Sequence, residues 1–278
     1  MLECLKDALI DTLKLLPYLW ITFLFLEWIE HKLDHHNEKL LRKNKKLGPI
    51  IGSLLGALPQ CGFSAMAANL FSSKVITMGT VIAVFLSTSD EMLPIMIGEK
   101  MPIVTVLEII GFKVFVGILI GFLVDLLWKP KKEQDHIHEL CENEHCSCEE
   151  DGIFYSSLKH TLKIGLFILI ANGILNSMIF AVGEDTLKNL LLKKNIIHYF
   201  LASLIGLIPN CASSVIMTEL FTSNLISLGT LLSGLLTGSG LGILLLFKTN
   251  RNMKENGKVL SLIYLVGVMI GILVDIII

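Results

Sequence analysis

The chain has 278 residues, of which 53% are hydrophobic and only 17% are charged, and its mean hydropathy is +0.69. About a quarter of the residues in soluble domains are charged, so this composition excludes a disordered chain, a nucleic-acid-binding protein and an ordinary soluble enzyme. The net charge of −2 attracts no anionic partner, and six cysteines are too few for a secreted disulfide scaffold. A polytopic membrane protein remains.

Eight apolar segments follow one another along the chain, each with the roughly 20 residues that a membrane-spanning helix needs. In order they are Leu9–Ile29, Gly48–Phe71, Val75–Ile97, Pro102–Trp128, Leu158–Val182, Tyr199–Phe221, Leu225–Phe247 and Val259–Ile278. The first is not a cleavable signal peptide, because it continues into Glu27, Trp28 and Glu30 without a small-residue cleavage site.

The two halves of the chain match at an offset of 150 residues. Nine of 21 pairs are identical between 53–73 and 203–223, and six of nine between 117–125 and 267–275. Shared Pro, Cys, Gly and Asp at one fixed offset are hard to explain by chance, and fused repeats are typical of transporter folds. The sequence therefore predicts a first membrane repeat at 1–128, a cytoplasmic linker rich in His and Cys at 129–155, and a second membrane repeat at 156–278.

A proline interrupts the matching segment of each half, at Pro59 and Pro209. A mid-helix proline removes a backbone donor and clashes with the preceding turn, so each segment is either a re-entrant pair of half-helices or one kinked span. If the interrupted segments are hairpins, each half has three full spans, and the second half has the opposite orientation in the membrane to the first. With the basic loop 31–46 in the cytoplasm, 129–152, which starts basic and becomes acidic, and 248–258 also face the cytoplasm. This arrangement follows the positive-inside rule, with a mild violation by the three lysines of the outside loop 183–198. We therefore predict an all-α protein of two inverted repeats, each with three spans and one broken hairpin, about ten hydrophobic segments in all.

The paired motifs Pro-Gln-Cys-Gly (59–62) and Pro-Asn-Cys-Ala (209–212), with Leu86-Ser-Thr-Ser-Asp-Glu91 after the first, resemble those of a known family. These are the ten-helix heavy-metal exporters of prokaryotes, described as arsenic efflux proteins and in some members as manganese transporters. The resemblance covers nearly the whole chain. It implies export of a metal or metalloid ion across the prokaryotic plasma membrane, without fixing the ion.

The candidate substrate site lies where the two interrupted segments meet, because broken helices at matching positions of two repeats indicate the substrate site. Its predicted residues are Pro59, Gln60, Cys61, Ser64, Asp90, Pro209, Asn210, Cys211, Ser214 and Glu219. The metal ligands among them would be Cys61, Cys211, Asp90 and Glu219. Thiolates select soft ions such as arsenite, Zn or Cu(I), whereas carboxylates and carbonyls suit Mn or Mg.

Each candidate also has a plain structural interpretation. A membrane cysteine is often a small hydrophobe, and Glu219 could simply lie at the membrane interface. Asp125 and Asp275 end their segments, so anchoring at the interface is the better interpretation for them. Glu108 and Lys113 are expected to be buried, with Lys113 paired to an acid on another helix.

The linker is a second candidate metal site. Its His and Cys residues are His136, His138, Cys141, His145, Cys146 and Cys148. Such a density of thiols and imidazoles binds Zn or Cu(I) readily, but the spacing matches no structural zinc signature. A disordered polar linker is the alternative.

The predicted function is secondary transport, with export of the ion by alternating access. No phosphate-binding loop of an ATPase occurs, so we expect no enzyme activity and no cofactor. The expected partners are the metal or metalloid ion, a coupling ion (H⁺, through Asp90 or Glu219) and the lipid bilayer, without nucleic acid; a homo-oligomer is compatible with the sequence. The rival is a membrane thiol–disulfide electron carrier that uses Cys61 and Cys211, and a passive channel is a third alternative.

Overall fold

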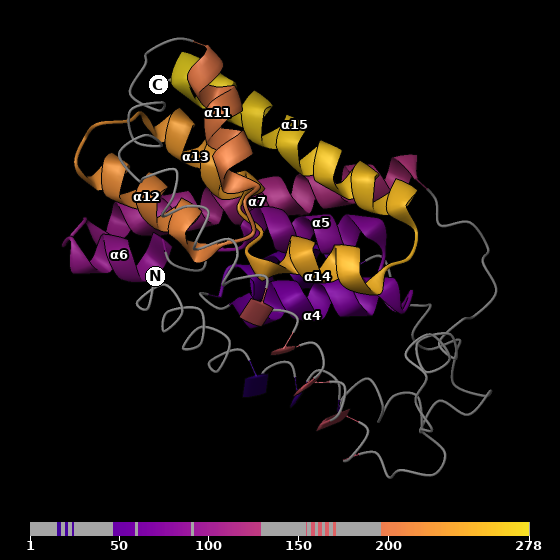
Figure 1. Cartoon of the computed structure of the whole chain (residues 1–278). Coiled ribbons are helices and arrows are strands. Elements are labelled where there is room, and N and C mark those ends of the chain that lie inside the picture. The colour runs from indigo at the N-terminus through magenta and orange to yellow at the C-terminus, as the bar shows by residue number, and fades with distance from the viewer. Residues whose placement is uncertain are drawn as a thin grey trace.

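The computed structural model describes residues 47–58, 61–89, 92–128 and 196–277, together with isolated positions within 16–24 and 154–170. All regular secondary structure in this part is helical (Figure 1). The first half contains α3 (Gly48–Gly56), α4 (Cys61–Ser72), α5 (Met78–Ser87), α6 (Met92–Gly98) and α7 (Ile103–Leu127). The second half contains α11 (Ile197–Gly206), α12 (Cys211–Thr222), α13 (Leu228–Thr237), α14 (Leu241–Thr249) and α15 (Met253–Ile277). Corresponding helices start within one residue of the 150-residue offset.

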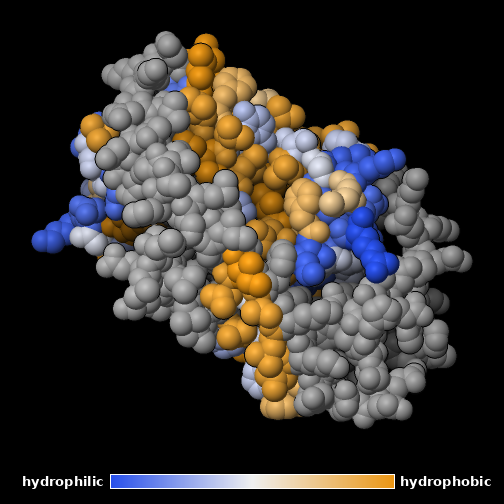
Figure 2. Space-filling view, in the orientation of Figure 1, coloured by the Kyte–Doolittle hydropathy of each residue, from blue (hydrophilic) through white to orange (hydrophobic). Residues whose placement is uncertain are grey.

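Among the described residues, four helical stretches are long and apolar enough to cross a bilayer. They are Met78–Gly98, Ile103–Leu127, Leu228–Thr249 and Met253–Ile277. A 25-residue helix is about 37 Å long, enough for a hydrocarbon core of about 30 Å. Two of these helices leave large apolar side chains uncovered, as at Leu126 (74% exposed) and Ile276 (73%). Figure 2 shows the described hydrophilic residues gathered mainly at two ends, with a hydrophobic zone between them. This is the surface of an integral, multi-pass membrane protein.

A carboxylate fixes the start of the central helix in each half. In the first half, Asp125 of α7 accepts hydrogen bonds from the backbone N–H of Gly79 (2.8 Å) and the hydroxyl of Thr77 (2.7 Å), the N-cap of α5. A carboxylate is stabilising at a helix N-terminus. Here α5 and α7 touch through backbone, because a Cβ on Gly79 would lie 2.1 Å from the carbonyl oxygen of Gly121. The equivalent residues of the second half are Asp275, Gly229, Ser227 and Gly271.

Within the first half, α3 and α5 run in the same direction, and α7 runs against them. Gly52 of α3 lies against Thr80 of α5, and Gly56 lies against Ser87. By contrast, Gly79 near the start of α5 lies against the end of α7. The absence of side chains on these glycines lets the three helices approach closely.

The two halves interlock through their short helices. Helix α4 packs against α14 of the other half, and α12 packs against α6. Ser64 near the start of α4 lies beside Gly242 near the start of α14. At the other end, the hydroxyls of Ser72 and Thr249 are hydrogen-bonded (2.7 Å). Helices α4 and α14 therefore run in the same direction, and Figure 1 shows them side by side.

The observed helices refine the expected segment bounds. Val75–Ile97 and Leu225–Phe247 correspond to the candidate spans Met78–Gly98 and Leu228–Thr249, and each span is made of two helices, α5 with α6 and α13 with α14. The final segment was expected to start at Val259, but α15 starts at Met253. The side chain of Asn252 accepts a hydrogen bond from the backbone N–H of Glu255 (3.4 Å), so polar capping residues extend this helix into the expected loop.

Candidate functional site

Three interruptions of membrane helices meet near the centre of the described part. Helix α5 ends at Thr88, whose ψ of 126° leaves the helical region. Helix α13 ends at Gly238 (ψ 85°), and Gly240 follows with φ 52°, a value that favours glycine. Between α11 and α12, Pro209 has no N–H to continue the helix. Polar backbone groups are thereby freed at three points inside an apolar fold.

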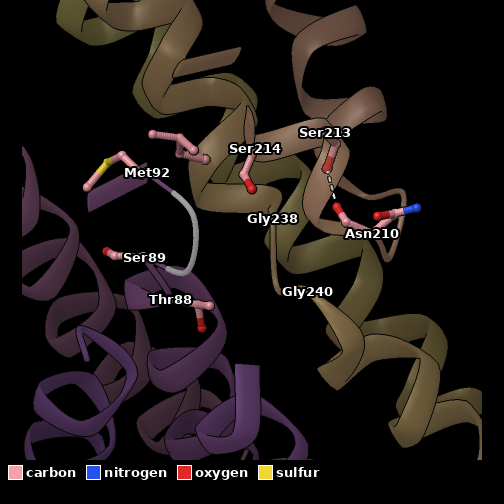
Figure 3. A pocket seen from close by; sticks show the side chains of 9 residues that line it. Thr88, Ser89, Met92, Asn210, Ser213, Ser214, Gly238 and Gly240 are labelled. Carbon is pink, nitrogen blue, oxygen red and sulfur yellow. Dashed lines mark hydrogen bonds between the residues drawn. The ribbon is translucent and has the colours of Figure 1, made fainter. Parts of the chain in front are cut away.

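A small pocket lies between these interruptions (Figure 3). The first half contributes Thr88, Ser89 and Met92, and the second contributes Asn210, Ser213, Ser214, Leu235, Gly238 and Gly240. Its cavity volume, measured for the centre of a water-sized sphere, is about 10 Å³, roughly what one water molecule needs. The pocket suits one small species held by residues of both halves.

The wall formed by α12 is fixed by a local hydrogen bond. The Ser213 hydroxyl donates to the backbone carbonyl of Asn210 at 2.9 Å, which Figure 3 draws as a dashed line. This bond links the residue before α12 to a residue three positions later in the chain. It also holds the turn after Pro209 against the first turn of α12.

Two predicted site residues, Asn210 and Ser214, line this pocket. Pro209 is half-buried next to Asn210 and forms the interruption itself. Both pocket residues lie where the predicted hairpin tip of the second half was expected. The structure therefore brings this tip to the pocket, whose opposite wall is the end of α5.

Two other predicted residues lie outside the pocket lining. Ser64 is buried against α14, where a Cβ on Gly242 would lie 2.9 Å from the Cβ of Ser64. Glu219 is exposed on α12, and its carbonyl accepts a hydrogen bond from Thr222 (3.0 Å). Their predicted roles stay predictions.

Several predictions fall outside the described residues. This applies to Pro59, Gln60, Asp90 and the linker residues His136, His138, Cys141, His145, Cys146 and Cys148. Cys61 and Cys211 start α4 and α12, but their side chains also lie outside the description. Among the residues that are described, no three His, Cys, Asp or Glu side chains are grouped closely enough to hold a metal ion.

The most informative residue that the site prediction omitted is Lys113 of α7, which is 0% exposed. Its ammonium donates hydrogen bonds to the backbone carbonyls of Thr88 and Leu235, the second at 3.1 Å. Both acceptors line the pocket, and they belong to different halves. A lysine inside an apolar segment was the available signal, since intramembrane ionisable residues are functional candidates.

Glu108 was expected to be buried like Lys113, but it is exposed. It lies only five residues after the first residue of α7, roughly 8 Å along the helix axis. This position is close enough to the helix end for a carboxylate to reach a polar environment.

Thr88 and Ser89 line the pocket. In the sequence they belong to the polar run that precedes Asp90, which is part of the family resemblance. Met92 could not have been distinguished from core by sequence. Gly238 and Gly240 form a Gly-Ser-Gly sequence after α13, at the position in the second half that matches the run before Asp90. Two close glycines within an apolar segment are a usable signal for a helix interruption.

Searches of curated proteins and of solved structures found no match to this chain. A family model described as "Putative, 10TM heavy-metal exporter" matches residues 1–201. The match covers well over half of the chain, including the first half of the fold and the start of α11. The chain therefore belongs to this family of heavy-metal exporters.

Proposed function

We propose that this protein is a secondary transporter that exports a metal or metalloid ion by alternating access, with the pocket between Thr88 and Asn210 as part of its transport site. The observation that carries the proposal is that both halves line one small pocket, with hydroxyl and amide side chains in its wall, at interruptions of membrane helices. Irregular backbone at membrane depth is tolerated where it lines a cavity, and transporters use such interruptions to bind ions.

The proposal includes inverted repeats. Helix α4 runs along α14 in the same direction, yet α4 precedes α5 in its own half, whereas α14 follows α13. Phe85 near the end of α5 packs near the start of α4, so α4 runs against α5. If α14 continues the direction of α13 within one span, α5 and α13 point in opposite directions. These contacts support two oppositely oriented halves, with α3–α4 and α11–α12 as re-entrant hairpins.

The ion and its coupling are proposed from residue chemistry. Cys61 and Cys211 start matching helices, and a site with two thiolates would favour a soft ion such as arsenite. Asp90 follows the pocket residue Ser89 in the sequence and is the proposed proton carrier, with Glu219 as the alternative. Export would proceed across the prokaryotic plasma membrane, with the linker 129–155 as a cytoplasmic metal-collecting segment.

Metal sensitivity of cells with and without the gene tests the proposal. Mn, Zn, Cu, arsenite and organoarsenicals are compared in parallel, with Cys61→Ser and Asp90→Asn variants. Loss of arsenite resistance in Cys61→Ser supports a soft ion. Manganese resistance that needs Asp90 and tolerates Cys61→Ser supports a harder one.

A pocket-filling variant tests the site itself. Ser214→Leu should abolish export, because the added volume exceeds the cavity, whereas Ser261→Leu on the exposed face of α15 should export normally. Export by Ser214→Leu at the normal rate would place the transport site elsewhere. If no tested metal affects the cells and thiol trapping shows Cys61 and Cys211 cycling through a disulfide, the electron-carrier alternative replaces the transporter.

A further inference from the structure

The buried ammonium of Lys113 bridges the two halves at the pocket. Its acceptors, the carbonyls of Thr88 and Leu235, are 25 and 122 residues away in the chain. Thr88 is the C-cap of α5, and Leu235 lies in the last turn of α13. Both carbonyls are among those that a helix C-terminus leaves without an intrahelical partner.

The electrostatics of the two helix ends explain why a cation lies there. A helix C-terminus carries the negative end of the helix dipole, equivalent to roughly half an elementary charge. Two such ends, from α5 and α13, face one ammonium. In transporters, unwound carbonyls and C-terminal ends of half-helices are the groups that coordinate coupling cations. Here a side chain of the protein occupies that kind of position.

The bridge exists once, although the scaffold around it is duplicated. The residue equivalent to Lys113 in the second half is Ile263, which is likewise 0% exposed. An isoleucine cannot donate to a carbonyl. The cation is therefore a specific feature of the first half, placed at a position where the second half keeps ordinary apolar packing.

We infer that Lys113 is a tethered cation of the transport site, which takes the place of a bound coupling cation by holding the interrupted ends of α5 and α13 together. The inference rests on the proposed transport function. Thr88 and Leu235 belong to different halves, so a movement of one half past the other separates the two carbonyls. The ammonium can then keep only one of them, and re-forming the bridge returns the site to the arrangement seen here.

Chemical rescue tests this inference in reconstituted vesicles that contain the full-length protein. Lys113→Ala removes the ammonium and leaves space for a small amine, so its export rate should fall at least tenfold. Methylammonium should restore a substantial part of that rate, because methylamine crosses the bilayer as the neutral base and is protonated at the site. Methanol, which is similar in size and uncharged, should not restore it. Ile263→Ala is the matched control, with a similar cavity in the second half and no expected response to methylammonium.

Each outcome bears on the tethered cation separately from the proposed function. Absence of metal export by the wild-type protein would refute the proposed function itself. Two outcomes refute the tethered cation alone, provided that the wild-type protein exports the metal. In the first, Lys113→Ala exports at the normal rate. In the second, methylammonium and methanol have equal effects on that variant. If Lys113→Ala does not accumulate in the membrane, Lys113→Met is used, because methionine is similar in length and uncharged. A folded Lys113→Met protein without export supports the inference, and one with a normal rate refutes it.

Discussion

The two halves of the molecule share a scaffold but differ at the pocket and at one end. Asp125 and Asp275 make the same hydrogen bonds to the starts of α5 and α13, at the same 2.8 Å from the glycine N–H. At the pocket, however, the position of Lys113 is occupied in the second half by the apolar Ile263. Duplication thus reproduced the features that hold helices together. The features that set charge and polarity at the centre diverged afterwards, which is expected if only one central site is needed.

The largest effect on stability is expected at the backbone contact between the central helices. Gly79→Ala places a Cβ where only 2.1 Å separates it from the Gly121 carbonyl oxygen, so α5 and α7 must move apart. Such overpacking costs about 1–3 kcal/mol or more. The equivalent Gly229→Ala should cost about the same. Thermal unfolding of the detergent-solubilised protein measures both.

Gly111 provides the control for this pair, because a Cβ there meets nothing within 4 Å. Gly111→Ala should leave stability unchanged or raise it by about 0.5–1 kcal/mol, since alanine is the better helix former. If Gly79→Ala and Gly111→Ala have equal stability, the close contact is absent in the membrane.

The next largest effect is expected at the carboxylates that cap the central helices. Asp125→Asn and Asp275→Asn each weaken charge-assisted hydrogen bonds and should lower the free energy of unfolding by about 1–2 kcal/mol. The Asp275 carboxylate also accepts a hydrogen bond from Tyr199 (2.7 Å), for which the first half has Pro49 at the equivalent position. Tyr199→Phe should therefore lower stability by a smaller amount, about 1 kcal/mol. Normal unfolding temperatures for both asparagine variants would contradict a capping role.

How far the sequence predicts this molecule depends on whether the deciding contact is local. The interruption at Pro209 is local, since proline lacks an N–H, and it was predicted. The shared Asp125 and Asp275 were found through the repeat, but their capping role was not, because it depends on helices packed 46 residues apart. The bridge from Lys113 to Leu235 spans 122 residues and both halves. Periodicity and composition contain no information on such a contact.

A smaller effect, an increase in stability, is expected at Asn69, whose equivalent in the second half is Glu219. Asn69 is 3% exposed, and neither atom of its amide group has a hydrogen-bond partner in the part of the chain that the structure describes. Glu219, at the equivalent position, is exposed. Because a buried unpartnered polar group costs about 1–3 kcal/mol, Asn69→Leu should stabilise the protein by about 1 kcal/mol. Glu219→Leu should give no such gain, and a loss of stability in Asn69→Leu would show that the amide is partnered in the membrane.

The smallest effect on stability is expected at an ion pair that joins the halves at one end only. Lys74 and Glu255 form a salt bridge of 2.7 Å, whereas the equivalent positions of the other pairing hold the uncharged Asn224 and Thr105. Lys74→Asn copies the second half and keeps a residue that tolerates the positive φ of 59°, matching 58° at Asn224. The Lys74 side chain is 43% exposed, so the pair should contribute less than about 1 kcal/mol.

The contribution of this salt bridge should disappear near 1 M salt, where the screening length is about 3 Å. A double-mutant cycle with Glu255→Gln measures this coupling at low and high salt, and a coupling that survives high salt would mean that the pair is shielded from water by parts of the protein packed over it.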